Sequence, residues 1–295
     1  MPNLKEVRNR ITSVNSTQQI TSAMKLVSAA KLKKAQDAIT RMRPYAGKLR
    51  DILENLSQSI DSSEGIYSRQ RDPNKVLLVV VTSNRGLCGA FNANVIKRAN
   101  LAIETTYANA SATGHLYVLT IGKKASSFFS KKSGIQHIAS HDELFSNLTF
   151  ESIIPVAEKV MQLFVKGDVD KVDFVYNQFK SAGSQIITLE PFLPVLPPEK
   201  SEQDNQSVSS EYIFEPSKAE IIENMIPLSL KTQFFKVLLD SHASEHGARM
   251  TAMHKATDNA SELLKNLKLS YNKARQAAIT NEILEIVAGA EALNG

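Results

Sequence analysis

Two histidines and a glutamate lie close together in the last third of the chain. Residues 242–246 read His-Ala-Ser-Glu-His, which matches the H-x-x-E-H pattern of inverted zinc proteases. On a helix the two imidazoles would share a face, with Glu245 beside them, as a zinc site requires. The pattern is short, however, and we expect it to lie in a long solvated helix. Glu245 also precedes Arg249 by four residues, a spacing that favours a surface ion pair.

A second candidate is a glycine-containing turn. Residues 82–89 read TSNRGLCG and stand between an expected strand and an expected helix. Rossmann and P-loop proteins bind phosphate at this position with glycine-rich turns. The segment has no third glycine at G-x-G-x-x-G spacing and no G-K-[ST]. A tight turn, in which glycine permits close backbone approach, explains it better than a nucleotide site.

The remaining candidates are single residues. Cys88 is the one cysteine, so an internal disulfide or a CxxC metal site is excluded and a reducing compartment is indicated. We expect Cys88 to be a small buried side chain. His137 and His141 lie in loop-like sequence and lack a clear third ligand. We therefore expect no catalytic residue, no metal and no cofactor in this chain.

The middle of the chain alternates between short β-branched runs and helical patterns, which predicts α/β architecture. Strands are expected at 75–82, 115–121, 135–139, 172–179 and 185–189. Helices are expected at 92–110, 123–132 and 151–165. This alternation is typical of a mainly parallel sheet in a three-layer domain. The polar, proline-rich segment 191–210 predicts a surface loop, and 212–214 a short edge strand.

Both ends of the chain have the spacing of a coiled coil. Apolar and small residues near the C-terminus alternate at steps of three and four, which is a heptad seam. They are Met253, Ala256, Ala260, Leu263, Leu267, Ser270, Ala274 and Ala277. The first helix has a stripe that begins at Leu4, shifts register near Thr17 and resumes at Ile20, Met24 and Val27. It continues through Ala35, Ala38, Met42, Tyr45, Leu49, Ile52 and Leu56.

These patterns predict three parts. An N-terminal coiled-coil helix spans 1–60, a central Rossmann-like α/β domain 75–215 and a C-terminal coiled-coil helix 217–295. The two terminal helices leave one compact domain, so they can form a long antiparallel coiled coil. Pro44 should kink the first helix, and Pro227 allows a break before the last.

The last turns of the C-terminal helix carry a second apolar stripe. Its members are Ile279, Ile283, Ile286, Ala290 and Leu293. The stripe lies beyond the expected reach of the first helix, so we expect an intermolecular partner for it, with a frayed end as the alternative.

Charge is concentrated in the first helix. The 295 residues carry a net charge of +5, yet residues 1–60 alone hold eleven Lys and Arg against four Asp and Glu. Such a surface could meet nucleic acid, anionic lipid or an acidic protein, and a solvated helix face is the alternative. No apolar run approaches the roughly 20 residues that span a bilayer, and no signal-peptide pattern opens the chain.

Three separated stretches resemble the γ subunit family of F-type ATP synthases. Residues 8–34 read RNRITSVNSTQQITSAMKLVSAAKLKK, and residues 82–92 read TSNRGLCGAFN. The third stretch, from Glu245 to Leu293, resembles the family's C-terminal helix almost throughout. NQFKSAGSQ at 177–185 adds a weaker match in the middle domain.

The resemblance implies a rotor in the central stalk. The coiled coil would thread a hexamer of α and β subunits, while the α/β domain would rest on the c-subunit ring and contact the ε subunit. Ion flow would turn the ring and drive the catalytic β subunits, so the chain would be a non-catalytic subunit. With no transit peptide before the first motif, it would be a peripheral membrane protein on the cytoplasmic face of a bacterial inner membrane.

The resemblance also assigns residues. Met24 matches a methionine that faces an acidic loop of the β subunit. Coupling and β-subunit contacts fall on Arg249, Arg275, Gln276, Thr280 and Glu285. The apolar bearing tip comprises Ile283, Ile286, Val287, Ala290 and Leu293. The foot above the c ring includes Tyr212, Phe214 and Glu215.

The chain departs from the family pattern at two positions. Ser22 stands where lysine is usual, and Asn84 where aspartate is usual. Two other interpretations remain. A basic coiled-coil protein could bind nucleic acid, with steeply salt-dependent affinity, and a Rossmann-like enzyme with helical arms would bind a nucleotide. Each accounts for one segment and leaves the others unexplained.

Overall fold

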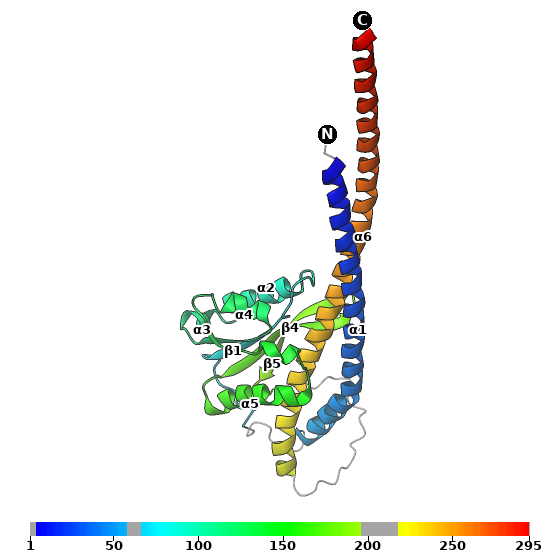
Figure 1. The fold of residues 1–295 in the computed structure, drawn as a ribbon. Helices are drawn as coiled ribbons and strands as arrows, with labels where there is room; N and C mark the ends of the chain where they lie inside the picture. The colour runs from blue at the N-terminus through cyan, green and yellow to red at the C-terminus, as the bar shows by residue number, and fades with distance from the viewer. Residues whose placement is uncertain (1–3, 58–65, 196–217, 295) are drawn as a thin grey trace. The chain divides into compact units, whose positions relative to one another are not determined.

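The computed structural model describes residues 4–57, 66–195 and 218–294 (Figure 1). The chain divides into two compact units, Met1–Ala29 with Arg249–Gly295, and Ala30–Ala248. Helices α1 (Leu4–Ser57) and α6 (Lys218–Asn294) each contribute to both units. The edge strand expected at 212–214 lies outside the described residues.

The second unit contains a five-stranded sheet in the order β3-β2-β1-β4-β5. Its strands are β1 (Val76–Val81), β2 (Leu116–Ile121), β3 (Gln136–Ser140), β4 (Lys171–Ser181) and β5 (Ser184–Leu193). The first four are parallel, and β5 pairs antiparallel with β4. The expected α/β fold with a mainly parallel sheet is therefore confirmed. β5 runs past the expected end at Leu189 because Pro191 and Leu193 still face β4 in the register.

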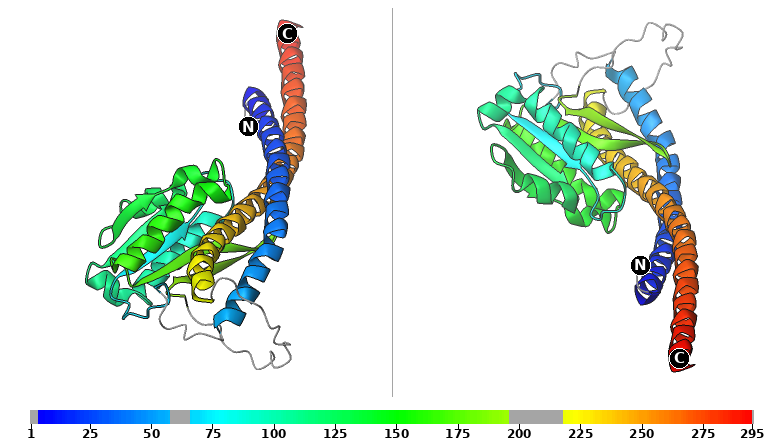
Figure 2. Two further views of the ribbon diagram at one scale, coloured as in Figure 1. Left: turned by 90° about the horizontal axis from the view of Figure 1, so that it is seen from below. Right: turned by 90° about the horizontal axis from the view of Figure 1, so that it is seen from above.

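Helices cover both faces of the sheet (Figure 2). One face packs against α2 (Phe91–Glu104), α3 (Ala108–Ala112) and α4 (Lys123–Phe129). The other packs against α5 (Phe150–Lys166) and residues 226–238 of α6, with a short 3-10 helix at Asp142–Phe145 beside them. The helix expected at 92–110 is divided in two, because the chain turns at 105–107 and buries Tyr107 against Asp173.

In the first unit, α1 and α6 run antiparallel. Gln18 Nε2 donates to Ser261 Oγ at 2.7 Å, and the hydroxyls of Thr21 and Thr257 hydrogen-bond at 2.8 Å. The step from Gln18 to Thr21 along α1 is therefore matched by a step from Ser261 back to Thr257 along α6. Continued to the start of α1, this register ends near Ala274, and every described side chain from 278 to 292 is exposed.

The seam of α1 continues without the register shift expected near Thr17. Ile20 and Val27 are exposed, whereas Thr21 and Ser28 are buried in the seam. Hydroxyls can occupy these positions because each has a hydrogen-bond partner. The expected shift was wrong because it followed apolar residues alone.

The seam of α6 differs from the expected one in two heptads, and in each the seam residue is shifted by one position. Leu264 is buried and Tyr271 is half-buried, whereas the expected Leu263 and Ser270 are exposed. Steps of three and four fit both choices, and the hydrogen bonds to α1 select between them.

Two helix-breaking residues lie inside the long helices. α1 continues past Pro44 to Ser57. α6 begins nine residues before Pro227, where a break was expected, and continues through this proline. Leu230 and Phe234, just beyond this proline, are buried against the sheet. Tertiary packing can thereby offset the main-chain hydrogen bond that proline removes.

Candidate functional site

The turn after β1 is held by its own side chains. Ser83 N–H donates to Asn92 Oδ1 at 2.9 Å, and the Ser83 hydroxyl donates to the Arg85 carbonyl at 2.6 Å. Asn92 Nδ2 donates to Cys88 Sγ at 3.2 Å, and Cys88 is buried as expected. Leu87, at φ 62°, is in the left-handed region. These hydrogen bonds are those of a tight turn closed by its own side chains.

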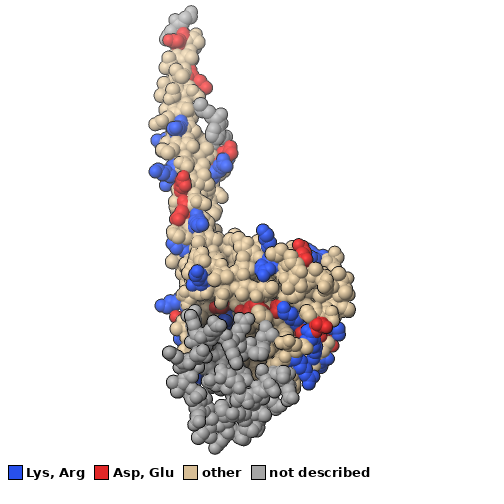
Figure 3. Space-filling model, turned by 180° about the vertical axis from the view of Figure 1, so that it is seen from behind, with Lys and Arg blue, Asp and Glu red and all other residues tan. Residues whose placement is uncertain are grey.

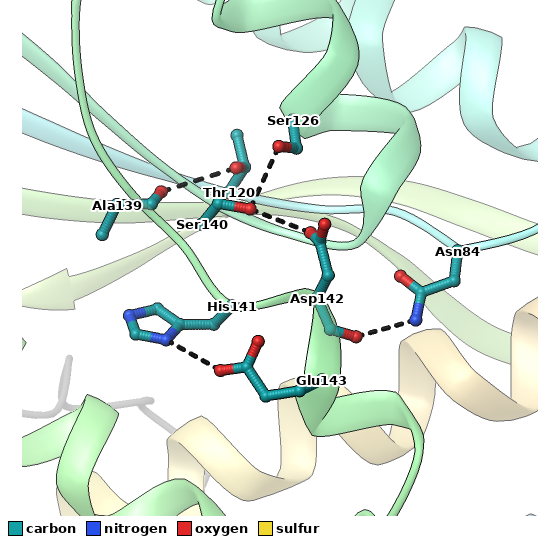
Figure 4. A network of polar contacts seen from close by, with 8 residues as sticks. All are labelled: Asn84, Thr120, Ser126, Ala139, Ser140, His141, Asp142 and Glu143. Atoms are coloured by element: carbon teal, nitrogen blue, oxygen red, sulfur yellow. Dashed lines mark hydrogen bonds and ion pairs between the residues drawn. The ribbon is translucent and has the colours of Figure 1, made fainter.

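Polar side chains at the carboxyl ends of β1, β2 and β3 bind one another (Figure 4). Asn84 Nδ2 donates to the Asp142 carbonyl at 2.7 Å, while Asn84 Oδ1 accepts from Lys123 N–H at 3.0 Å. Ser140 Oγ lies 3.0 Å from both Ser126 Oγ and Asp142 Oδ1. Ligands of open α/β sheets bind at this edge, but here these groups connect the loops.

The Asn84 contacts explain one departure from the family pattern. An aspartate at this position would accept from Lys123 N–H, but a carboxylate has no hydrogen to donate to the Asp142 carbonyl. The amide can do both. Asn84 thus joins the turn after β1 to the segments that follow β2 and β3.

The H-x-x-E-H segment is buried, so the expected solvated helix was wrong. Glu245 and His246 are buried, and the Phe145 ring stacks on the His242 ring. His242 Nε2 and His246 Nε2 are 3.1 Å apart, a hydrogen bond in which one ring donates and the other accepts. Arg249 is also buried, so the expected surface ion pair with Glu245 does not lie at the surface.

Side chains that could bind a metal ion do not cluster in the part of the chain that the structure describes. No group of three or more His, Cys, Asp or Glu side chains there is placed to hold a metal ion. His137, expected in a loop, lies in β3, where its Nε2 hydrogen-bonds Thr120 Oγ1 at 2.9 Å. His141 follows β3, and its Nδ1 contacts Glu143 at 3.3 Å.

Two tyrosine–carboxylate pairs lie inside the second unit. Tyr107 donates to Asp173, which also pairs with Lys171 at 3.2 Å. Burial raises the pKa of Asp173, while the Tyr107 hydrogen bond and Lys171 oppose the rise. Tyr176 donates to Glu190, and burial followed by that contact raises the pKa of Tyr176. Both pairs were missed from the sequence, because no local pattern indicates them. Tyr107 and Asp173 are 66 residues apart, and Tyr176 and Glu190 lie on the two neighbouring strands β4 and β5.

The residues expected to contact other subunits lie on the long helices. Met24 is half-buried on α1, and Arg249 is buried on α6. Arg275, Gln276, Thr280 and Glu285 are exposed on α6, where Thr280 Oγ1 donates to the Gln276 carbonyl at 2.9 Å. The structure places these four along one exposed segment. The expected foot residues Tyr212, Phe214 and Glu215 lie outside the described residues.

The end of α6 has exposed apolar side chains. Ile283, Ile286 and Val287 are 55%, 66% and 50% exposed, and Ala290 is exposed too. Leu293 lies in α6, but its side chain is not described. Leu284, which is not a member of the expected apolar stripe, is also exposed. No Lys or Arg follows Arg275, and Figure 3 shows no blue side chain at this end of the helix.

No helix among the described segments is both long enough and apolar enough to cross a membrane. The end of α6 also carries Glu282, Glu285 and Glu291 beside its exposed apolar side chains.

Comparison with known proteins identifies the family. The family model described as ATP synthase matches residues 3–293. A protein named ATP synthase gamma chain from Flavobacterium johnsoniae is 58% identical over 296 residues, with all of both chains covered. Its namesake from Flavobacterium psychrophilum is 56% identical over the same length and coverage. The chain belongs to the ATP synthase gamma chain family.

Solved structures share the fold of this gamma chain family member. In the Euglena gracilis mitochondrial ATP synthase, a chain of the OSCP/F1/c-ring structure aligns with a TM-score of 0.68 and 20% identity. That alignment covers 98% of this chain and 94% of the other. A chain of the rotor structure of the same enzyme aligns with a TM-score of 0.62 and 18% identity, covering 94% and 98%.

Proposed function

We propose that this chain is the central-stalk rotor of an F-type ATP synthase, coupling transmembrane proton flow to ATP synthesis and hydrolysis on other subunits. The observation that carries the proposal is full-length similarity to proteins named ATP synthase gamma chain. The antiparallel pairing of α1 with α6 supports it, because a rotor needs a stiff element that holds its shape under load.

The exposed end of α6 suits a bearing inside the hexamer of α and β subunits. Ile283, Ile286 and Val287 are exposed and would turn against an apolar collar. Ala290 and Leu293 would complete this tip. Apolar contact is non-directional, so it permits rotation while it excludes water.

Contacts with the β subunit are proposed along the two helices. Met24 lies on the helix that carries most of the basic surplus, which suits an acidic loop of the β subunit. Arg275, Gln276, Thr280 and Glu285 are exposed and offer charged or hydrogen-bonding groups to a second β-subunit loop. Arg249 is buried, so we propose that it acts by holding the helix in place.

We propose that the α/β unit binds the ε subunit and the c-subunit ring. Tyr212, Phe214 and Glu215 are proposed as the contacts with the ring. The similarity to chains of rotor and c-ring structures supports this arrangement. The subunit would then be a peripheral protein on the cytoplasmic face of the bacterial inner membrane, with no nucleic-acid partner and no catalytic site of its own.

The test is ATP turnover by the purified chain alone and after assembly with matching α and β subunits. We expect no turnover by the chain and rapid turnover by a complex with one copy per hexamer. Turnover by the chain itself, or failure to enter the hexamer, would overturn the proposal and direct attention to residues 85–89.

A further inference from the structure

Part of α6 is docked on the sheet by an apolar stripe. Leu230, Phe234, Val237 and Leu238 are fully or almost fully buried in the core that the sheet shares with α5. The Phe234 ring meets the Phe174 ring edge-on, with 5.1 Å between centroids. Such packing strongly resists separation of the helix from the sheet, but apolar contact has little directional preference.

Two polar contacts stand beside this stripe. Lys231 Nζ lies 2.6 Å from Glu158 Oε1 on α5. Gln233 Nε2 donates to Glu190 Oε1 on β5 at 3.0 Å. The other carboxylate oxygen of Glu190 accepts from the buried Tyr176 hydroxyl, so this contact is anchored inside the domain.

The two contacts lie on opposite sides of the stripe. With 3.6 residues per turn, positions two apart are separated by roughly 200° around the helix. Lys231 and Gln233 therefore flank Leu230 and Phe234 on either side. Roll of α6 in one direction stretches the contact with α5, and roll in the other direction stretches the contact with β5. Hydrogen bonds weaken steeply with distance and angle, so the pair opposes rotation of the helix about its own axis.

We propose that these two contacts form a bracket through which the α/β domain passes torque to α6. The inference rests on the proposed rotor function and adds its positioning residues: Lys231, Gln233, Glu158 and Glu190. The apolar stripe holds the helix on the domain, and the bracket fixes its rotational angle. Without the bracket, the domain can turn by a small angle before the helix follows, so ion flow and ATP turnover lose their fixed ratio under load.

The first variants reverse each contact without changing side-chain size much. Lys231→Glu places two carboxylates together at Glu158, and Gln233→Glu does the same at Glu190. Each has a matched rescue. Glu158→Lys restores an ion pair in the first case. Glu190→Gln restores the second, because a glutamine can donate to the new carboxylate and accept from Tyr176.

The readout is ATP-driven proton pumping per ATP hydrolysed, measured with the complete complex in sealed vesicles. We expect Lys231→Glu with Gln233→Glu to retain hydrolysis and lose pumping against a proton gradient, and the fourfold variant that adds both rescues to recover it. A purely structural role would lower thermal stability and leave pumping per ATP unchanged in assembled complexes. That second result, or pumping that stays lost in the fourfold variant, would overturn the bracket.

Lys236→Glu is the control, because Lys236 lies on the same helix and outside both contacts. It should pump as the unchanged chain does. If the reversed variant does not assemble, Lys231→Ala with Gln233→Ala takes its place, with the same two outcomes. Failure of the unchanged chain to join the hexamer would instead overturn the rotor proposal, so the two failures are distinguishable.

Discussion

Asp173 is a buried carboxylate whose ionisation should affect the stability of the α/β unit. Tyr107 and Lys171 both contact its Oδ2, while Oδ1 is buried and has no hydrogen-bond partner among the described residues. Burial is the largest cause of its raised pKa, and both partners oppose it. The folded chain therefore holds this proton more tightly than the unfolded chain does.

The sign of the pH dependence follows from that difference. The stabilisation by the bound proton is fully present below the ordinary pKa of 3.8 and is lost as pH rises through the raised value. We expect the free energy of unfolding of the unchanged chain to fall, relative to Asp173→Asn, over that rise. Urea unfolding at a series of pH values measures the difference.

Asp72→Asn controls for the loss of one negative charge, because Asp72 is an exposed aspartate of the same unit. A difference between the unchanged chain and Asp173→Asn that stays constant with pH would contradict the expectation. A free energy of unfolding that rises with pH in the unchanged chain, relative to Asp173→Asn, would contradict it too.

At the scale of single elements, two glycines of α6 have opposite roles. A Cβ at Gly247 would lie 2.8 Å from the Ala182 carbonyl oxygen in the β4–β5 turn, whereas nothing lies within 4 Å of one at Gly289. Gly247 is thus required by the close approach of the hairpin to the helix. Gly289 has no such contact, and its helix propensity is lower than that of alanine, so it destabilises this part of α6.

The two alanine substitutions should therefore change the free energy of unfolding in opposite directions. Gly247→Ala should destabilise the chain by about 1–3 kcal/mol through overpacking. Gly289→Ala should stabilise the end of the helix by up to about 1 kcal/mol. Circular dichroism during thermal and urea unfolding measures both. Equal effects at the two positions would contradict the proposed contact with the hairpin.

Polar residues in the seam show how one helix determines the register of another. Thr21 and Thr257 are ordinary helix residues in the sequence, but across the pair their hydroxyls select one axial alignment. Hydrogen bonds specify register in this way because a slipped alignment leaves the buried hydroxyl without a cross-helix partner. The pairing also determines how far α6 extends past the start of α1.

At the scale of the whole molecule, we expect the α/β unit to fold without the exposed end of α6. Residues 279–295 belong to the other compact unit, and their described side chains are exposed. Truncation after Ala278 should leave the folding of 30–248 unchanged and weaken the proposed bearing, so we expect torque in the assembled hexamer to fall. Single-molecule rotation and ATP synthesis rates measure this effect.

A matched pair of point substitutions tests whether the apolar surface matters for torque when the length of α6 is unchanged. Ile286→Asp introduces a charge on the exposed apolar surface, whereas Asn281→Asp introduces one at a polar position nearby. We expect lower torque only for Ile286→Asp. Unchanged ATP synthesis in the truncated chain would argue against a bearing at this end.

The sequence by itself determined the class of fold and the family. Strand and helix alternation is a local pattern, because side-chain period follows backbone geometry, and it predicted β1 to β4 within one or two residues. The motifs at 8–34, 82–92 and 245–293 indicated the family that the comparisons then identified.

The tertiary structure decided which faces are buried and which polar groups meet. His246 and Glu245 looked like solvated helix residues, yet the segment is buried. Steps of three and four in α6 allowed either Leu263 or Leu264 in the seam, and pairing with α1 selected Leu264. The contacts of Lys231 and Gln233 join residues more than forty positions apart. Periodicity reports the conformation of one segment, whereas burial and hydrogen bonding depend on a partner that folding brings alongside.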